Sequence, residues 1–173
     1  EQSVTGNITE LICYYRPFKT GIGIADKLIS HAQYLRVYKK LITAFIKANG
    51  LPAVVHVHVA LKAGILAKWL KKKFLLPYLV TEHWSGYFPG SKLNIYEANP
   101  VLRNSNKTIL QQANIIVPVT KNLGETISAY FVPVKYEVIP NVVNTALFYY
   151  KPCNPEKFRF IHPSGMDEMK NPA

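Results

Sequence analysis

The chain has 173 residues, of which 49% are hydrophobic and 18% are charged. This apolar content excludes intrinsic disorder, and the absence of an uninterrupted run of about 18 apolar residues excludes a predicted membrane-spanning helix. Lys and Arg number 21 against 10 Asp and Glu, and the resulting charge of +11 favours an anionic partner: nucleic acid, an anionic membrane or a phosphorylated substrate. Two cysteines, Cys13 and Cys153, are too few for a disulfide framework and indicate either reduced thiols in the cytoplasm or a single disulfide.

The first half of the chain alternates between strand and helix patterns. A β-branched and aromatic segment predicts a strand over 8–15. Apolar residues three and four apart then predict an amphipathic helix over 25–48, ended by Gly50 in a left-handed cap. Residues 52–59 are almost continuously apolar, which is typical of a strand buried on both faces of a parallel sheet. A further helix is predicted over 61–73.

The second half continues this alternation. Strands are predicted over 77–82, 114–119 and 135–139, and helices over 100–113 and 121–130. Thr120 is the expected N-cap of the last helix, because its hydroxyl can accept a bond from a free backbone N–H. Such alternation predicts βαβ units and therefore an α/β fold: a Rossmann-like parallel sheet with helices on both faces.

The composition changes after Phe148, where the strand and helix patterns give way to tyrosines and prolines. We therefore predict a first domain over 1–148. Residues 149–173 are predicted to hold a linker and the first strand of a second domain, at 158–162. A single strand cannot bury its own apolar face, so this second domain is expected to be incomplete.

Polar side chains follow four successive strands of the predicted sheet: His58, His83, Thr120 and Asn141. Ligands of open parallel sheets bind beyond the carboxyl ends of the strands, so these residues mark a candidate binding edge. His83 stands between Glu82 and Trp84, just before an irregular stretch, and we interpret it as a hydrogen-bond donor to a substrate hydroxyl or phosphate. Glu82 either pairs with a cation or satisfies backbone N–H groups.

Two histidines suggest a different chemistry. His56 and His58 are two residues apart on a predicted strand, so their side chains point to one face and could chelate a metal ion. Metal-dependent hydrolases of the barrel type use this spacing on their first strand. No acidic or cysteine cluster accompanies the pair in the sequence, so a structural role is favoured and the hydrolase is kept as an alternative.

The predicted helix over 61–73 is rich in lysine. Either this is a solvated helix face, or it is a membrane-facing patch made of Lys68, Trp69, Lys71, Lys72 and Lys73. Stacking aromatics interleaved with base-reading arginines are missing from the sequence, which disfavours nucleic acid. A non-catalytic basic module that binds an anionic membrane or nucleic acid is a second alternative.

Four groups of residues follow one another in a characteristic order. They are His56-Val57-His58 with Gly64, Thr81-Glu82-His83-Trp84, Val117-Pro118-Val119-Thr120 with Leu123, and Val138-Ile139-Pro140-Asn141-Val142-Val143-Asn144-Thr145 with Phe148. In this order they resemble the N-terminal half of the family-four (group 1) glycosyltransferases of GT-B architecture. The resemblance extends to Ser164-Gly165-Met166-Asp167-Glu168-Met169-Lys170-Asn171, which is similar to the loop where the second Rossmann domain of that family begins.

This resemblance implies a bacterial hexosyltransferase of polysaccharide or glycolipid biosynthesis. Such an enzyme transfers a sugar, with retention, from a nucleotide diphosphate sugar to a sugar or lipid-linked acceptor, and it needs neither a metal nor another cofactor. The resemblance implies that His83 lies near the reacting sugar and that Lys170 contacts the donor diphosphate. The remaining residues then bind the acceptor: His58, Glu82, Trp84, Thr120 and Asn141. A cytoplasmic protein in peripheral contact with the inner face of the cell membrane is expected.

Three parts of the family pattern are not found in the sequence. The first strand with its glycine-rich loop would precede residue 1, and the paired glutamates of the donor domain would lie beyond Ala173. An Arg shortly before Lys170 is also missing, since residues 164–169 contain none. We therefore expect a fragment without transferase activity of its own.

Overall fold

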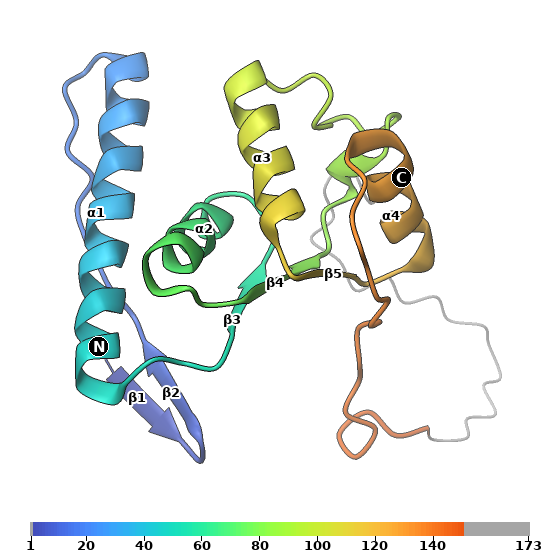
Figure 1. Cartoon of the computed structure of the whole chain (residues 1–173), viewed down its shortest axis with the longest axis horizontal. Helices are drawn as coiled ribbons and strands as arrows, with labels where there is room; N and C mark the ends of the chain where they lie inside the picture. The colour runs from blue at the N-terminus through green and yellow to red at the C-terminus, as the bar shows by residue number, and fades with distance from the viewer. Residues whose placement is uncertain (1, 151–173) are drawn as a thin grey trace, which may run out of the picture. The chain divides into compact units, whose positions relative to one another are not determined.

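The structure is a computed structural model that describes residues 2–150. Its contacts divide the chain into a first compact unit, Glu1–Asn141, and a second, Val142–Ala173. The helices and strands of the described residues all belong to the first unit, and Figure 1 labels them. Cys153, Lys170 and the strand predicted over 158–162 lie outside the described residues.

Three parallel strands form the centre of the first unit. They are β3 (Val55–His58), β4 (Tyr78–Glu82) and β5 (Ile115–Pro118), in the spatial order β3-β4-β5. The helices α2 (Ala63–Phe74) and α3 (Pro100–Gln112) connect them, because parallel neighbours require a crossover. The predicted α/β fold, a parallel sheet flanked by helices, is confirmed.

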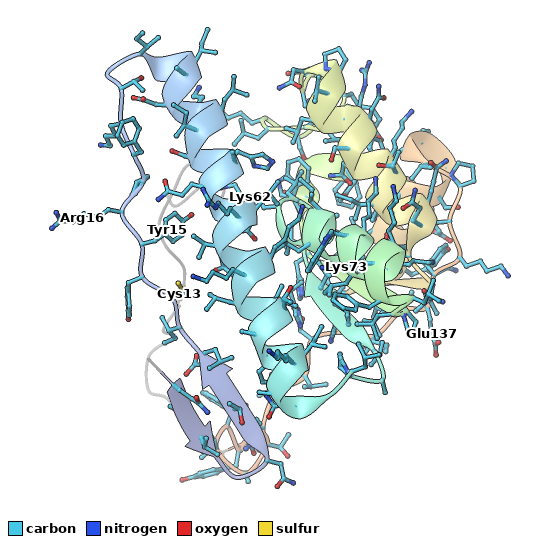
Figure 2. The ribbon with its side chains drawn as sticks, turned by 60° about the vertical axis from the view of Figure 1, so that its left-hand side comes forward. Cys13, Tyr15, Arg16, Lys62, Lys73 and Glu137 are labelled. Atoms are coloured by element: carbon cyan, nitrogen blue, oxygen red, sulfur yellow. The ribbon has the colours of Figure 1, made fainter. Side chains whose placement is uncertain are left out.

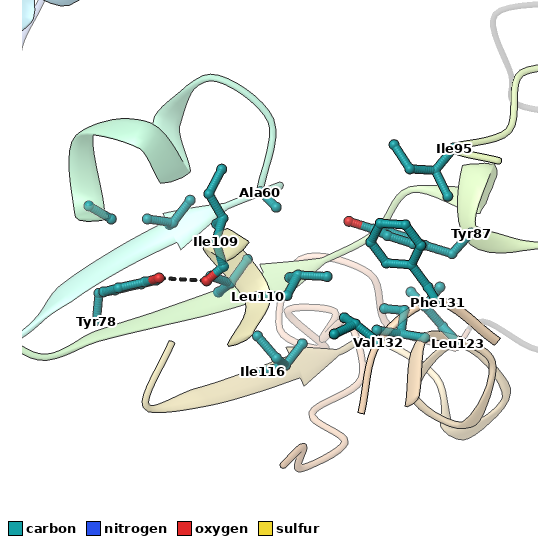
Figure 3. Packing of buried hydrophobic residues seen from close by; sticks show 14 residues of the cluster. Ala60, Tyr78, Tyr87, Ile95, Ile109, Leu110, Ile116, Leu123, Phe131 and Val132 are labelled. Atoms are coloured by element: carbon teal, nitrogen blue, oxygen red, sulfur yellow. Dashed lines mark hydrogen bonds between the residues drawn. The ribbon is translucent and has the colours of Figure 1, made fainter. Parts of the chain in front are cut away.

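The hydrophobic core lies on the face of the sheet that carries Tyr78, Val80 and Ile116. Val80 pairs with Ile116 in the parallel register, and all three side chains are buried. The Tyr78 hydroxyl donates a hydrogen bond to the Ile109 carbonyl of α3, as Figure 3 shows. Helix α2 approaches α3 closely at Gly64, where a Cβ would lie 2.4 Å from Cγ2 of Ile109. The small residue at this position is what allows the two crossover helices to pack together.

Helix α4 (Lys121–Thr126) follows β5 and continues into a π-helical turn, Ile127–Phe131. The predicted cap is confirmed, because the Thr120 hydroxyl oxygen accepts a hydrogen bond from the Leu123 N–H at 3.2 Å. The strand predicted over 135–139 runs parallel to β5 and bonds to it, but only Tyr136 forms a ladder bridge, with Ile116. The prediction thus places this segment correctly beside β5, but the segment does not form a continuous strand.

The strand predicted over 8–15 is shorter and pairs differently. Residues Ile8–Leu11 form β2, which is antiparallel to β1 (Gln2–Thr5) in a separate two-stranded sheet. The expectation that this segment opens the βαβ series is therefore wrong. The reason is local: Gly6, with φ of 58°, and Asn7 make a two-residue connection that suits a hairpin.

Helix α1 (Gly23–Asn49) confirms the amphipathic helix predicted over 25–48. The Gly50 N–H donates to the Ile46 carbonyl, and its φ of 84° is positive as predicted. Its ψ of 178° is extended, so the cap is not the left-handed helical one that we expected. None of the 27 residues of α1 is buried, which sets this helix apart from α2 and α3.

The prediction that strand 52–59 is buried on both faces is wrong. Only Val57 of β3 is buried, and His56 and His58 on the opposite face are exposed. Within the described residues β3 pairs with β4 alone, so it lies at an edge of the sheet. The helix-covered face accounts for the burial of Val57, because Val57 pairs with Val80 of the core.

Candidate functional site

The structure brings two of the predicted site residues together at the carboxyl end of the sheet. His58 is the last residue of β3, and His83 directly follows β4. Their ring centroids are 5.9 Å apart, and the planes are inclined by 24°. Both side chains are exposed. They therefore offer neighbouring imidazoles to a ligand beyond the strand ends, which is where open parallel sheets bind their ligands.

His56 extends this pair into a row of three histidines. Its ring centroid is 4.3 Å from that of His58, and its Nε2 lies 2.7 Å from the Thr81 hydroxyl oxygen. Burial, and then the charge of His58, lower the pKa of His56 below its ordinary value. Among residues 2–150, no group of three or more His, Cys, Asp or Glu side chains could hold a metal ion. The geometry of His56 thus favours hydrogen bonding to Thr81 over the metal alternative.

Glu82 lies beneath this edge and has 0% of its surface exposed. Its Oε1 accepts a hydrogen bond from the Ala60 N–H at 2.7 Å and one from the Tyr87 hydroxyl at 3.0 Å. Burial raises the pKa of this carboxyl, and its hydrogen bonds offset part of the increase. The sequence left two roles for Glu82, pairing with a cation or satisfying a backbone N–H. The structure shows the second, because the carboxylate accepts the hydrogen bond from the Ala60 N–H. Because this side chain has no exposed surface, its place in the structure suits the positioning of the neighbouring loops, and its predicted contact with the acceptor stays a prediction.

The carboxylate of Glu82 ties together the two loops that carry the histidines. Ala60 follows His58 by two residues, and Glu82 itself precedes His83. Tyr87 belongs to the short 3-10 helix η1 (Ser85–Tyr87), so the same carboxylate also holds the start of the irregular stretch. A single buried group therefore sets the spacing of the candidate binding edge.

Two members of this network were not predicted from the sequence. The Tyr87 hydroxyl lies 3.0 Å from Oδ1 of Asn106, which is fully buried on α3. One signal could have revealed Asn106: it stands three and four residues before Ile109 and Leu110, on the apolar stripe of its helix. Tyr87 had no such signal, because it lies in a segment without periodicity.

The loop between β3 and α2 has an unusual backbone. Val59 has φ of 64° and Lys62 has φ of 61°, which side chains with a Cβ rarely adopt. Strained residues of this kind persist only where the surrounding structure holds them, and they cluster at functional sites. Here the bond from Ala60 to Glu82 supplies that support.

Trp84 folds back onto its own loop. Its side chain is half-buried, and a Cβ at Gly86 would lie 2.1 Å from Cζ2 of the indole. The ring meets Tyr87 edge-on, with centroids 5.4 Å apart. Glycine at position 86 is thus needed for this arrangement, which leaves only part of the indole surface for a ligand.

Two further predicted residues lie at later strand ends and are both exposed. Thr120 is the N-cap described above, so its oxygen is already engaged as an acceptor while its O–H stays available as a donor. Asn141 is the last residue of the first unit. No hydrogen bond of the described residues joins Thr120 or Asn141 to the histidines.

The lysines of α2 are less free than the sequence suggested. Lys68 Nζ donates to the Thr108 hydroxyl, and Lys71 Nζ donates to the Gln112 carbonyl, each at 2.6 Å. Trp69 is half-buried, with Lys39 and Lys73 over its ring. Lys72 and Lys73 are exposed. Two of the four lysines in the predicted membrane-facing patch therefore form hydrogen bonds that hold α2 to α3.

Residues 22–142 match the family described as "Glycosyl transferase 4-like domain". The chain belongs to this family. The predicted resemblance to the group 1 glycosyltransferases of GT-B architecture is thereby confirmed. No curated protein matches the sequence significantly.

A solved structure shows the same fold. The chain is similar to sucrose-phosphate synthase from Thermosynechococcus elongatus, with a TM-score of 0.55 and 19% sequence identity. The match covers 69% of this chain and 29% of that one. This glycosyltransferase-like chain thus spans less than a third of the length of the synthase that it resembles. None of the helices in residues 2–150 has the length and hydropathy to cross a bilayer.

Proposed function

We propose that the intact protein is a hexosyltransferase of polysaccharide or glycolipid biosynthesis. It transfers a sugar, with retention, from a nucleotide diphosphate sugar to a sugar or lipid-linked acceptor. Residues 1–148 form the acceptor side, and the donor diphosphate is held in the second domain by Lys170. The observation that supports this proposal is the exposed pair of His58 and His83 at the strand ends of a glycosyltransferase 4-like domain.

In this proposal His83 is the catalytic residue and hydrogen-bonds the reacting sugar. An imidazole can donate or accept a hydrogen bond near neutral pH, which suits a sugar hydroxyl or a phosphate oxygen. His58 contacts the acceptor beside it, and the exposed Trp84 surface, the Thr120 hydroxyl and the Asn141 amide contribute further contacts. Glu82 acts through the backbone, because it holds the loops on which the two histidines stand.

The test is donor-dependent transfer by the intact protein. A panel of nucleotide diphosphate sugars is supplied, and release of the nucleoside diphosphate is measured with and without acceptor sugars. We expect His83→Ala to lower turnover at least about 100-fold, which is the usual effect of removing one hydrogen-bond donor positioned at the reacting centre. His31→Ala is the matched control, because His31 is an exposed histidine on α1, and turnover should not change.

The experiment distinguishes failure of the transferase proposal from failure of the site assignment. If no donor is consumed, the transferase proposal is wrong and the basic module is the better explanation. If donor is consumed equally well by His83→Ala, the activity stands but the site assignment is wrong. The 173-residue chain alone is expected to be inactive under the same conditions. A tightly bound zinc ion, together with loss of activity on chelation, would instead support the hydrolase built on His56 and His58.

A further inference from the structure

Helix α3 carries a buried amide that does not suit its surroundings. Asn106 has 0% of its surface exposed and lies on the same stripe of the helix as Ile109 and Leu110, which belong to the hydrophobic core. Its Nδ2 has no hydrogen-bond partner among the described residues. A buried N–H group without a partner destabilises the folded state, whereas leucine, of similar volume, would not. An amide that weakens the packing of its own helix indicates a role beyond stability.

Asn106 competes with Glu82 for one hydrogen. The Tyr87 hydroxyl oxygen lies 3.0 Å from Oδ1 of Asn106 and 3.0 Å from Oε1 of Glu82. Burial, followed by the charge of Glu82, raises the pKa of Tyr87 well above its ordinary value, so the hydroxyl keeps its single hydrogen. This hydrogen can be donated to only one of the two oxygens at a time. If the amide turns by 180°, its Nδ2 donates to the Tyr87 oxygen and the hydroxyl donates to Glu82. The orientation of the Asn106 amide therefore decides which bond the Glu82 carboxyl receives.

Glu82 passes this effect on to the loop that follows His58. Its Oε1 also accepts a hydrogen bond from the Ala60 N–H, at 2.7 Å, and the neighbouring Val59 N–H donates to a carbonyl of β4. With φ of 64°, the β-branched Val59 is strained, and such a conformation persists only where neighbouring groups hold it. Figure 2 shows Lys62, the last residue of this loop, beside α1, which has no buried residue. Both bonds come from β4, so a change at the Glu82 carboxyl loosens the strained loop.

We propose that Asn106 and Tyr87 are positioning residues for the histidines of the candidate site. Asn106 orients the Tyr87 hydroxyl, Tyr87 orients the Glu82 carboxyl, and Glu82 holds the strained loop directly after His58. Helix α3 thereby sets the position of His58 relative to His83, although Asn106 and Tyr87 are themselves fully buried. The effect on turnover rests on the transferase function proposed above, whereas the effect on the histidines does not.

Stability and positioning are measured separately. Urea unfolding of the 173-residue chain reports stability, and we expect Asn106→Leu to be at least as stable as the wild type, because it removes the unpaired Nδ2. NMR of the chain, isotope-labelled at the imidazole Cε1, reports positioning, because the neighbouring rings of His58 and His83 shift each other's resonances. Asn106→Leu and Tyr87→Phe should each move these two resonances and leave that of His31 in place.

Two control variants remove hydrogen bonds of the same core that are not part of this network. Tyr78→Phe removes a buried hydroxyl that donates to a carbonyl of α3, so it matches Tyr87→Phe. Thr108→Val removes a side-chain hydroxyl that links α3 to α2, so it matches Asn106→Leu. Both controls are expected to lower stability and to leave the two histidine resonances unchanged.

Turnover by the intact protein tests whether the position of the histidines matters for transfer. Asn106→Leu and Tyr87→Phe should each lower kcat by up to about 100-fold, the cost of a displacement of about 1 Å at a reacting centre. The donor KM should stay the same, because in the proposed function the second domain holds the donor. Glycine adopts a positive φ without strain, so adding Val59→Gly to Asn106→Leu should restore part of the lost kcat. Val54→Gly, just before β3, is the control for this rescue and should restore nothing.

Three outcomes would overturn the proposal. If Asn106→Leu and Tyr87→Phe leave the two histidine resonances unchanged, the network does not position these side chains. If Tyr78→Phe moves the resonances as much as Tyr87→Phe does, any loosening of the core is sufficient. If Asn106→Leu loses more stability than Thr108→Val, the amide serves the packing of α3. Should the intact protein consume no donor, the transferase function fails, and the NMR result still decides whether the network positions the histidines.

Discussion

Two regions of the first unit have similar apolar patterns and very different burial. Residues 55–139 hold the parallel sheet and its crossover helices, with a continuous buried cluster. Residues 2–49 hold the hairpin and α1, and no side chain of these elements is buried. Both regions were predicted to belong to one series of βαβ units. The difference shows that an amphipathic sequence predicts a helix but not the surface that covers it.

The reason lies in the connections. Helices α2 and α3 each join two neighbouring parallel strands, so the chain must bring them back against the sheet. Helix α1 instead joins β2 of the hairpin to β3 of the other sheet. Nothing in that connection forces it onto the core, and its apolar side chains stay available to a partner.

The largest expected effect comes from truncating one apolar side chain in each region. Ile109→Ala removes a side chain that is 1% exposed and packs against α2, so it should lower the free energy of unfolding by about 2–5 kcal/mol. Leu28→Ala on α1 should change it by less than about 0.5 kcal/mol. Urea unfolding followed by circular dichroism measures both. Equal losses would show that α1 is as well packed as α3.

A smaller effect is expected from adding one methyl group. At Gly64 a Cβ meets Ile109, so Gly64→Ala should destabilise the fold by about 1–3 kcal/mol despite the better helix propensity of alanine. At Gly23, the first residue of α1, nothing lies within 4 Å of a Cβ. Gly23→Ala should therefore be neutral or slightly stabilising in the same unfolding experiment. A stabilised Gly64→Ala variant would contradict the close packing of α2 on α3.

The smallest expected effect is a pH dependence of the free energy of unfolding, which comes from the buried carboxyl of Glu82. Burial raises the pKa of Glu82 in the folded state, so the folded protein holds this proton to higher pH than the unfolded chain does. The protonated form therefore stabilises the fold below the ordinary glutamate pKa of about 4.3, and this contribution is lost as the pH rises through the raised value.

Glu82→Gln keeps an oxygen acceptor for Ala60 and Tyr87 but cannot ionise. The stability of this variant relative to the wild type should increase between about pH 4 and neutrality, in urea titrations at several pH values. Glu97→Gln, at an exposed carboxyl, is the control. A difference between Glu82→Gln and the wild type that is constant with pH would mean that the buried carboxyl does not titrate in this range.

The candidate site could be predicted only in part. The rule for parallel sheets was enough to place His58 and His83 at one edge, because both directly follow strands with clear patterns in the sequence. The burial of Glu82 was not predictable, since its partners Ala60 and Tyr87 lie in segments without periodicity. Asn106 was accessible in principle, as a polar residue on an apolar stripe. The exposure of His56 depended on the edge position of β3, which no local pattern encodes.

By itself, the sequence determined the type and order of most elements and the local caps. Helix α1, the Thr120 cap and the hairpin turn at Gly6 depend on residues a few positions apart, so their causes are all present in the local sequence. The tertiary structure alone decided which apolar faces are covered. It exposed one face of β3, left α1 without a buried residue and enclosed Glu82. Burial depends on contacts between residues far apart in the chain, and these follow from strand order and crossover connections.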